Sequence, residues 1–127
     1  GLLLFTNDPQ WAARITDPET GPRKTYHVQI DCIPDTTLLS AWCEGVNAEG
    51  ERLAAVSATL LRAGEKNAWV EIVLDEGRNR QIRRLLSAFG IGTLRLIRVA
   101  VGGLVLGTLP KGQWRSLEAE DLRRIDE

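Results

Sequence analysis

The stretch Asp75–Gly90, DEGRNRQIRRLLSAFG, decides how this part of the chain folds and points to what it binds. Four arginines occupy the seven positions from Arg78 to Arg84, in a chain whose formal net charge is −1. A helix turns by about 100° per residue, so the stretch gathers its apolar side chains into one sector. That sector must face a core and contains Ile82, Leu85, Leu86 and Phe89.

The arginines of this helix are not equivalent. Arg80 and Arg84 lie opposite the apolar sector and are expected to project into solvent or onto a ligand, whereas Arg83 lies near its edge, where it can be partly buried and paired. A merely soluble helix face usually interleaves acidic residues with basic ones, and this face has none. The pattern therefore favours a phosphate partner. Donors near the helix start would add to the binding, from Arg78, Asn79, Arg80 and Gln81.

The positive charge extends beyond this helix. Residues 77–117 hold eight basic side chains and no Asp or Glu, so the rest of the chain, with eight basic and 17 acidic side chains, carries −9. Binding depends on the local field more than on the total charge, so a block of this size favours a polyanionic partner. The commonest such partner is nucleic acid.

Composition limits the other possibilities. With 127 residues, 43% of them hydrophobic, the chain is long enough for one domain with a core. Cys32 and Cys43 lack metal-ligand spacing and His27 is the single histidine, so neither a metal site nor a disulfide is expected. No run approaches the roughly 20 apolar residues of a membrane helix, and Gly1–Phe5 lacks the basic flank of a signal peptide. We expect a cytoplasmic single-domain protein whose residue 1 lies inside a longer chain.

Strands and helices alternate along the sequence. Alternating polarity predicts strands at residues 24–30, with Lys24 and Tyr26 on one face, and 93–101, with Leu94, Leu96 and Arg98 on one face. Asp35 is expected to cap a helix over residues 36–46. Two strands, 51–64 and 67–77, are expected to meet at a polar turn. The remaining elements are strands at 1–6 and 113–117 and helices at 9–15, after Asp8-Pro9, and 118–126.

Three motifs in order resemble one enzyme family. Residues 76–117 resemble the carboxy-terminal signature of the RsuA-type pseudouridine synthases, GLLLFTND at residues 1–8 resembles the strand and turn after that family's catalytic loop, and KTYHVQI resembles its lysine-x-tyrosine strand. Pro9 and Asp17 depart from residues common in the family. The resemblance implies an α+β fold with a mixed, mainly antiparallel sheet flanked by helices. It also implies a monomer that isomerises uridine in ribosomal RNA without metal or cofactor.

The resemblance also implies roles for individual residues. Tyr26 matches the active-site tyrosine, whose ring stacks on the flipped base and whose hydroxyl helps to move the C5 proton. Arg83 matches the arginine that pairs with the catalytic aspartate, and Leu96 matches an apolar residue of the uracil pocket. Without the motifs, Tyr26 and Leu96 are ordinary core residues and Arg83 forms a structural salt bridge. Contacts to the RNA backbone are expected from Lys24, Arg80, Arg84 and Arg98.

The family's catalytic aspartate belongs to a GRLDxxT loop directly before the glycine matched by Gly1, and these 127 residues contain no such motif. Asp8 is better explained as a helix cap. We therefore expect the parent protein to form pseudouridine, with large-subunit ribosomal RNA favoured, and this chain alone to be inactive. Two alternatives stay open: a non-catalytic RNA-binding module, and an α+β domain whose basic face binds an acidic protein.

Overall fold

A computed structural model describes residues 22–48, 50–75, 80–102 and 104–105. The elements expected at residues 1–15 and 113–126 lie outside the described residues, as do Arg78 and Asn79. Within the described ranges, no helix combines the length and the apolar character needed to cross a membrane.

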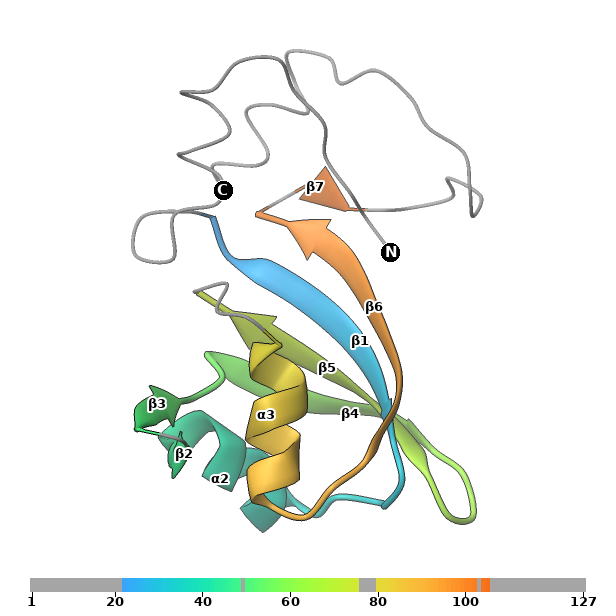
Figure 1. Cartoon of the computed structure of the whole chain (residues 1–127). Coiled ribbons are helices and arrows are strands. Elements are labelled where there is room, and N and C mark those ends of the chain that lie inside the picture. Colours follow the sequence, from blue (N-terminus) through green and yellow to red (C-terminus); the bar gives the residue numbers. More distant parts are fainter. Residues whose placement is uncertain (1–21, 49, 76–79, 103, 106–127) are drawn as a thin grey trace.

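The described residues form an α+β fold around one antiparallel sheet (Figure 1). Its strand order is β4-β5-β1-β6-β7, and every neighbouring pair in it is antiparallel. The sheet strands are β1 Lys24–Ile30, β4 Ser57–Ala63, β5 Ala68–Leu74, β6 Thr93–Val101 and β7 Leu104–Val105. The other elements are the helices α2 Thr36–Glu44 and α3 Gln81–Ala88, and a small hairpin of β2 Val46–Ala48 and β3 Glu51–Leu53.

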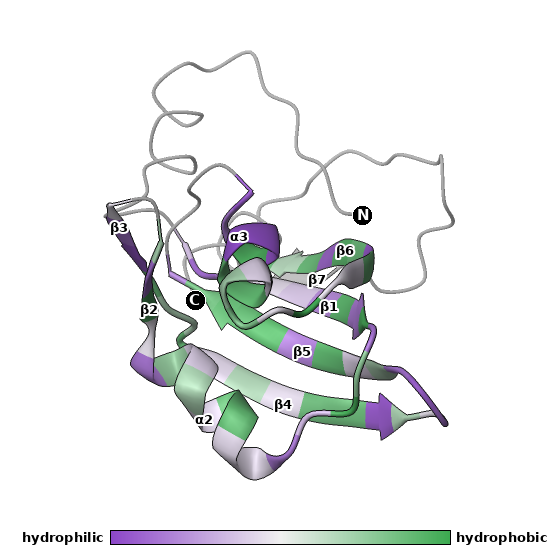
Figure 2. Ribbon diagram, turned by 60° about the horizontal axis from the view of Figure 1, so that its bottom comes forward, coloured by the Kyte–Doolittle hydropathy of each residue, from purple (hydrophilic) through white to green (hydrophobic). Residues whose placement is uncertain are grey.

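The core lies between one face of the sheet and the two helices. Alternate residues of β1 and β5 face it, including Val28, Ile30, Val70 and Ile72, all fully buried. The helices contribute Trp42 from α2 and Ile82, Leu85 and Leu86 from α3. In Figure 2 both helices lie over the same side of the sheet, and we call this side the helix face and the opposite side the far face.

The bounds of β1 and β6 are those predicted from alternation, residues 24–30 and 93–101. The apolar sector of α3 is also confirmed, because Ile82, Leu85 and Leu86 are buried and Phe89 packs against them as a half-buried side chain. Asp35 caps α2 as expected, since its Oδ1 accepts a hydrogen bond from the backbone N–H of Leu38 at 2.8 Å.

The hairpin β2–β3 was not predicted. The sequence suggested a helix to residue 46 and one strand over 51–64, but α2 ends at Glu44 and the strand is divided between β3 and β4. Gly45 causes the early end, because its φ of 94° and ψ of 170° suit glycine and take the chain out of the helix. Ala55 then donates its N–H to the carbonyl of Trp42 at 2.9 Å, which holds the chain between β3 and β4 against α2.

Candidate active-site face and arginine groove

Strand pairing brings three of the predicted site residues to the helix face. Tyr26 on β1 is the direct partner of Arg98 on β6, and Val28 is the partner of Leu96. Directly opposed residues on antiparallel strands point to the same side, and Val28 is buried in the core below α3. Tyr26 and Leu96 are both half-buried and pack against that core. The sheet therefore gathers Tyr26, Leu96 and Arg98 beside one another on the helix face.

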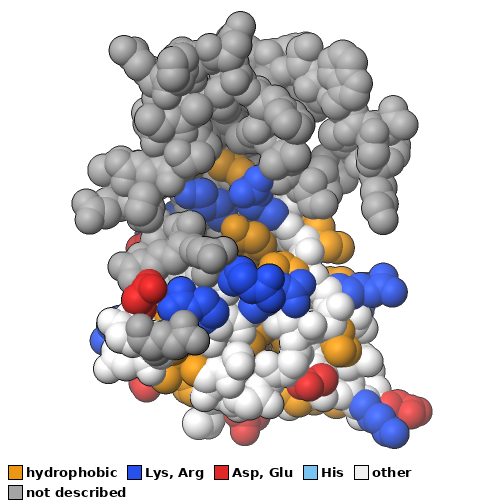
Figure 3. Space-filling model, in the orientation of Figure 1, with side chains coloured by type: hydrophobic (Ala, Val, Ile, Leu, Met, Phe, Trp, Pro, Cys, Tyr) orange, Lys and Arg blue, Asp and Glu red, His pale blue; other side chains and the backbone are white. Residues whose placement is uncertain are grey.

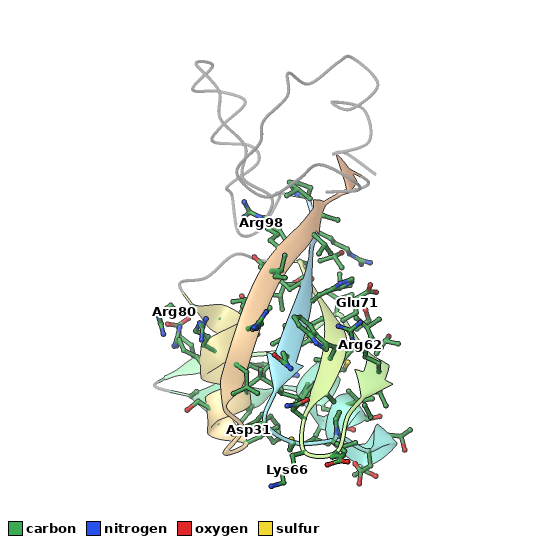
Figure 4. All side chains as sticks on the ribbon, turned by 90° about the vertical axis from the view of Figure 1, so that its right-hand side faces the viewer. Asp31, Arg62, Lys66, Glu71, Arg80 and Arg98 are labelled. Atoms are coloured by element: carbon green, nitrogen blue, oxygen red, sulfur yellow. The ribbon has the colours of Figure 1, made fainter. Side chains whose placement is uncertain are left out.

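Arg80 and Arg98 lie on the same side of the sheet although they come from different elements. Figure 4 shows the Arg98 side chain extending from β6 toward the side that carries α3 and Arg80. In Figure 3 the Lys and Arg side chains on this side of the molecule form two groups with hydrophobic side chains between them. Part of the basic block of residues 77–117 thus lies on this side of the sheet, with Arg80 and Arg98.

A groove of about 360 Å³ runs along the exposed side of α3. Its walls are formed by the end of β2 and by α3, through Ala48, Arg80, Arg83, Arg84, Ser87 and Ala88. Arg80 precedes the first helical residue with a φ of 51°, a left-handed conformation that directs the chain into α3, and its side chain is exposed. Arg83 is half-buried. Three arginines line the groove, so an anion such as a phosphate group entering it would meet guanidinium groups.

The three residues expected to converge on one cleft do not all line this groove. Arg83 lines it, whereas Tyr26 and Leu96 lie against the core on the helix face and are absent from its walls. All three lie on the same side of the sheet, because α3 packs on the face that carries Tyr26 and Leu96. Arg83 and Tyr26 therefore lie on the same side of the sheet, as the site assignment requires, but they do not line one groove.

Arg84 is less exposed to solvent than the helix sequence suggested, because it has an acidic partner. Its Nη2 donates a hydrogen bond to Oε1 of Glu51 at 3.2 Å, and only 21% of its side-chain surface is exposed. The acidic partner that the helix sequence lacks is supplied by β3, 33 residues earlier in the chain. Helical spacing carries no signal of this pair, because the two residues meet only when the hairpin packs against α3.

Two further predicted RNA contacts are buried. Lys24 is 5% exposed and Gln81 is 3% exposed. Lys24 begins β1 on the side of Tyr26, as predicted, and this side faces inward. Neither side chain has the solvent-facing position that a contact to the RNA backbone assumes, so the structure does not support these two assignments. Arg80, with an exposed side chain, and the half-buried Arg98 retain that prediction.

The reactive side chains elsewhere in the described ranges do not form a second catalytic cluster. Burial raises the pKa of the Cys32 thiol, and the nearby charge of Asp31 raises it further, so the thiol form is favoured over the nucleophilic thiolate. His27 hydrogen-bonds Glu71 at 3.1 Å on the far face. Among the described residues, no three His, Cys, Asp or Glu side chains come close enough together to hold a metal ion.

Comparison with known proteins gives the family. The family model described as RNA pseudouridylate synthase matches residues 1–88. The chain belongs to this family. The match includes β1, with Tyr26, and α3, together with the three groove arginines Arg80, Arg83 and Arg84. It confirms the resemblance drawn from the three motifs.

Some of the similar proteins are named for the large ribosomal subunit and others for the small one. Ribosomal large subunit pseudouridine synthase E of Xanthomonas campestris pv. campestris is 43% identical over 97% of this chain and 74% of its own length. Ribosomal small subunit pseudouridine synthase A of Pseudomonas aeruginosa is 36% identical over 96% of this chain and 53% of its own. A crystal structure of a pseudouridylate synthase matches with a TM-score of 0.78 and 30% identity, over 94% of this chain and 52% of that one. The α+β fold is therefore that of the family.

Proposed function

We propose that this chain is the part of a ribosomal RNA pseudouridine synthase that holds the base and the RNA backbone. The observation that carries the proposal is the pairing of Tyr26 with Arg98 and of Val28 with Leu96 on the helix face, the side of the sheet that also carries the arginine groove. An aromatic ring, an apolar side chain and guanidinium groups on one surface suit a flipped base and its phosphates. Family membership identifies the base as uracil.

The reaction rearranges one nucleotide without redox chemistry. The C1′–N1 bond of uridine breaks, the base turns, and a C1′–C5 bond forms. The proton that leaves C5 is balanced by the proton gained at N1, so the product is an isomer of the substrate. The groups that act on uracil must therefore hold the detached base and move one proton.

Tyr26 is suited to both tasks. Its ring stands half-buried on the packed surface of β1 and offers a fixed stacking face, while its hydroxyl can exchange a proton with the base. Leu96 on β6 is the partner of Val28, two residues from Tyr26 on β1. Its apolar side chain excludes water from one side of the base. Arg80 and Arg98 hold phosphates on the same side of the sheet.

Arg83 is the residue proposed to form an ion pair with the catalytic aspartate of the family's GRLDxxT motif. A half-buried guanidinium at the edge of the core stabilises an adjacent carboxylate in its charged, nucleophilic form. The 127 residues contain no GRLDxxT motif, so we propose that a segment outside them supplies this aspartate. We also propose that the substrate is large-subunit RNA, because the relative with 43% identity carries that name. We expect the parent protein to act as a monomer.

The experiment uses 23S and 16S ribosomal RNA transcribed in vitro, which contains no pseudouridine. Each RNA is incubated with the parent protein and, separately, with the 127-residue chain, and pseudouridine is then mapped chemically. We expect one modified uridine in 23S RNA with the parent protein and none with the chain. Modification of 16S RNA alone would reject the large-subunit assignment. RNA binding by the parent without any pseudouridine would favour the non-catalytic RNA-binding module.

A further inference from the structure

A row of four side chains crosses the far face of the sheet. Arg62 on β4 is the direct partner of Trp69 on β5, Trp69 is the partner of Gln29 on β1, and Gln29 is the partner of Arg95 on β6. Directly opposed residues on antiparallel strands point to the same side. Figure 4 shows Arg62 and Glu71 on the side of the sheet away from Arg80 and α3. We call these four residues the Arg62–Arg95 row.

The row presents a stacking surface between two positive charges. Arg62 and Arg95 are exposed, whereas Trp69 and Gln29 are half-buried. The Arg62 guanidinium carbon lies 5.5 Å from the centroid of the Trp69 ring, so the planar cation is held over the aromatic side chain. Neighbouring strands are about 4.8 Å apart, so the row spans roughly 14 Å from β4 to β6.

We propose that the Arg62–Arg95 row binds a single-stranded segment of RNA. At about 3.4 Å per stacked nucleotide, the row matches a segment of roughly four nucleotides. The Arg62 guanidinium plane stacked on Trp69 supplies a face on which a base can stack, and the two terminal arginines supply contacts to phosphate. An acidic peptide would engage the two charges but would leave the stacking surface unused, so the combination favours RNA.

An acidic residue, Glu71, lies beside the Arg62–Arg95 row but is not part of it. Glu71 lies two residues after Trp69 on β5, on the same face, and its Oε2 lies 3.1 Å from Nε2 of His27. Its carboxylate is therefore engaged laterally along the sheet. The side chains of Thr59 and Ile97 extend the same line on either side of this pair, and both are uncharged.

The row is distinct from the arginine groove, because the two surfaces lie on opposite faces of the sheet. The inference rests on the proposed ribosomal RNA substrate and adds a second contact to it. A folded ribosomal RNA has single-stranded segments near its helices, and a segment bound on the far face would orient the RNA whose target uridine enters the helix face. The predicted consequence is tighter binding without a direct part in the chemistry.

The test measures binding of the 127-residue chain to a fluorescein-labelled oligouridylate of about twelve nucleotides, by anisotropy over a range of salt concentrations. Arg62→Gln and Arg95→Gln each remove one positive charge from the row, and Lys66→Gln removes one from the exposed β4–β5 turn as the matched control. We expect each row variant to weaken binding about fivefold and to lower the salt slope by about 0.7, while the control changes affinity less than about twofold.

Stacking is tested separately with Trp69→Leu, which is expected to weaken binding about tenfold, and with Trp69→Phe, which should restore most of the affinity. Urea unfolding of each variant identifies any loss caused by misfolding. If Arg62→Gln, Arg95→Gln and Trp69→Leu all bind as the wild type does while Arg80→Glu weakens binding, the inference is overturned and the proposed function stands. Weaker binding by the row variants supports the inference of an RNA contact on the far face, whether or not the parent protein forms pseudouridine.

Discussion

Replacing Gly45 by alanine should destabilise the fold through the hairpin that forms one wall of the arginine groove. The φ of 94° and ψ of 170° at Gly45 lie in a region that is essentially restricted to glycine, and a side chain there costs about 1–3 kcal/mol. A Cβ at this position would also lie 3.0 Å from the carbonyl oxygen of Leu53 and 3.0 Å from Cβ of Ala54. These atoms belong to the paired hairpin and its continuation, so they cannot rotate away. Overpacking of this kind adds about 1–3 kcal/mol, and we expect a total loss of roughly 2–6 kcal/mol.

Gly50 provides the matched control. Its φ of 81° is also positive, but a Cβ added there meets no atom within 4 Å. Gly50→Ala should therefore show the conformational cost alone, about 1–2 kcal/mol. The free energy of unfolding is measured in urea for the wild type and both variants, with unchanged m-values required for the comparison.

The ordering of the two glycine variants is the critical result. If Gly45→Ala and Gly50→Ala lose the same stability, the close approach of the hairpin to the end of α2 has no energetic weight, and the argument from the 3.0 Å contacts is wrong. A larger loss for Gly45→Ala, with weaker RNA binding, would show that the hairpin position also shapes the groove.

Three other outcomes follow from the structure. Arg80→Glu should weaken RNA binding and flatten its salt dependence in anisotropy titrations without changing the urea midpoint, because the side chain is exposed; an unfolded variant would contradict this. Tyr26→Phe in the parent protein should slow pseudouridine formation by about 10²–10⁴-fold in a mapping time course with RNA affinity retained, because the ring stays and the proton-transferring hydroxyl is lost. Cys32 should react with iodoacetamide more slowly than free cysteine at pH 8, because its pKa is raised, and the reaction should become faster as the pH rises. Asp31→Asn should accelerate the reaction, because it removes a negative charge that raises this pKa.

Much of the helix face could be predicted because its signals are local. Alternation along KTYHVQI and TLRLIRVAV gave the bounds of β1 and β6, and helical spacing gave the buried sector of α3. These patterns depend only on residues close in sequence. The motifs around Tyr26 and Arg83 then gave the family.

Local patterns failed where distant segments meet. Helical spacing could not show that Glu51 pairs with Arg84, nor could alternation show that Lys24, on the inward side of β1, is buried. The hairpin was missed because its strands have three residues each, too few for a periodic signal.

The sequence by itself determined the bounds of β1 and β6, the apolar sector of α3, the basic block and the family motifs, because each of these depends on residues that are close together in the chain. The tertiary structure alone decided the register that sets Tyr26 against Arg98, with an irregularity between Thr25 and Tyr26 that shifts the pairing of β1 and β6. A shift of one residue in a strand turns its side chains to the opposite face, so this register decides which surface receives the base. The registers of three strand pairs together align Arg62, Trp69, Gln29 and Arg95, and the strands β1 and β6 that complete this row are far from β4 and β5 in the sequence.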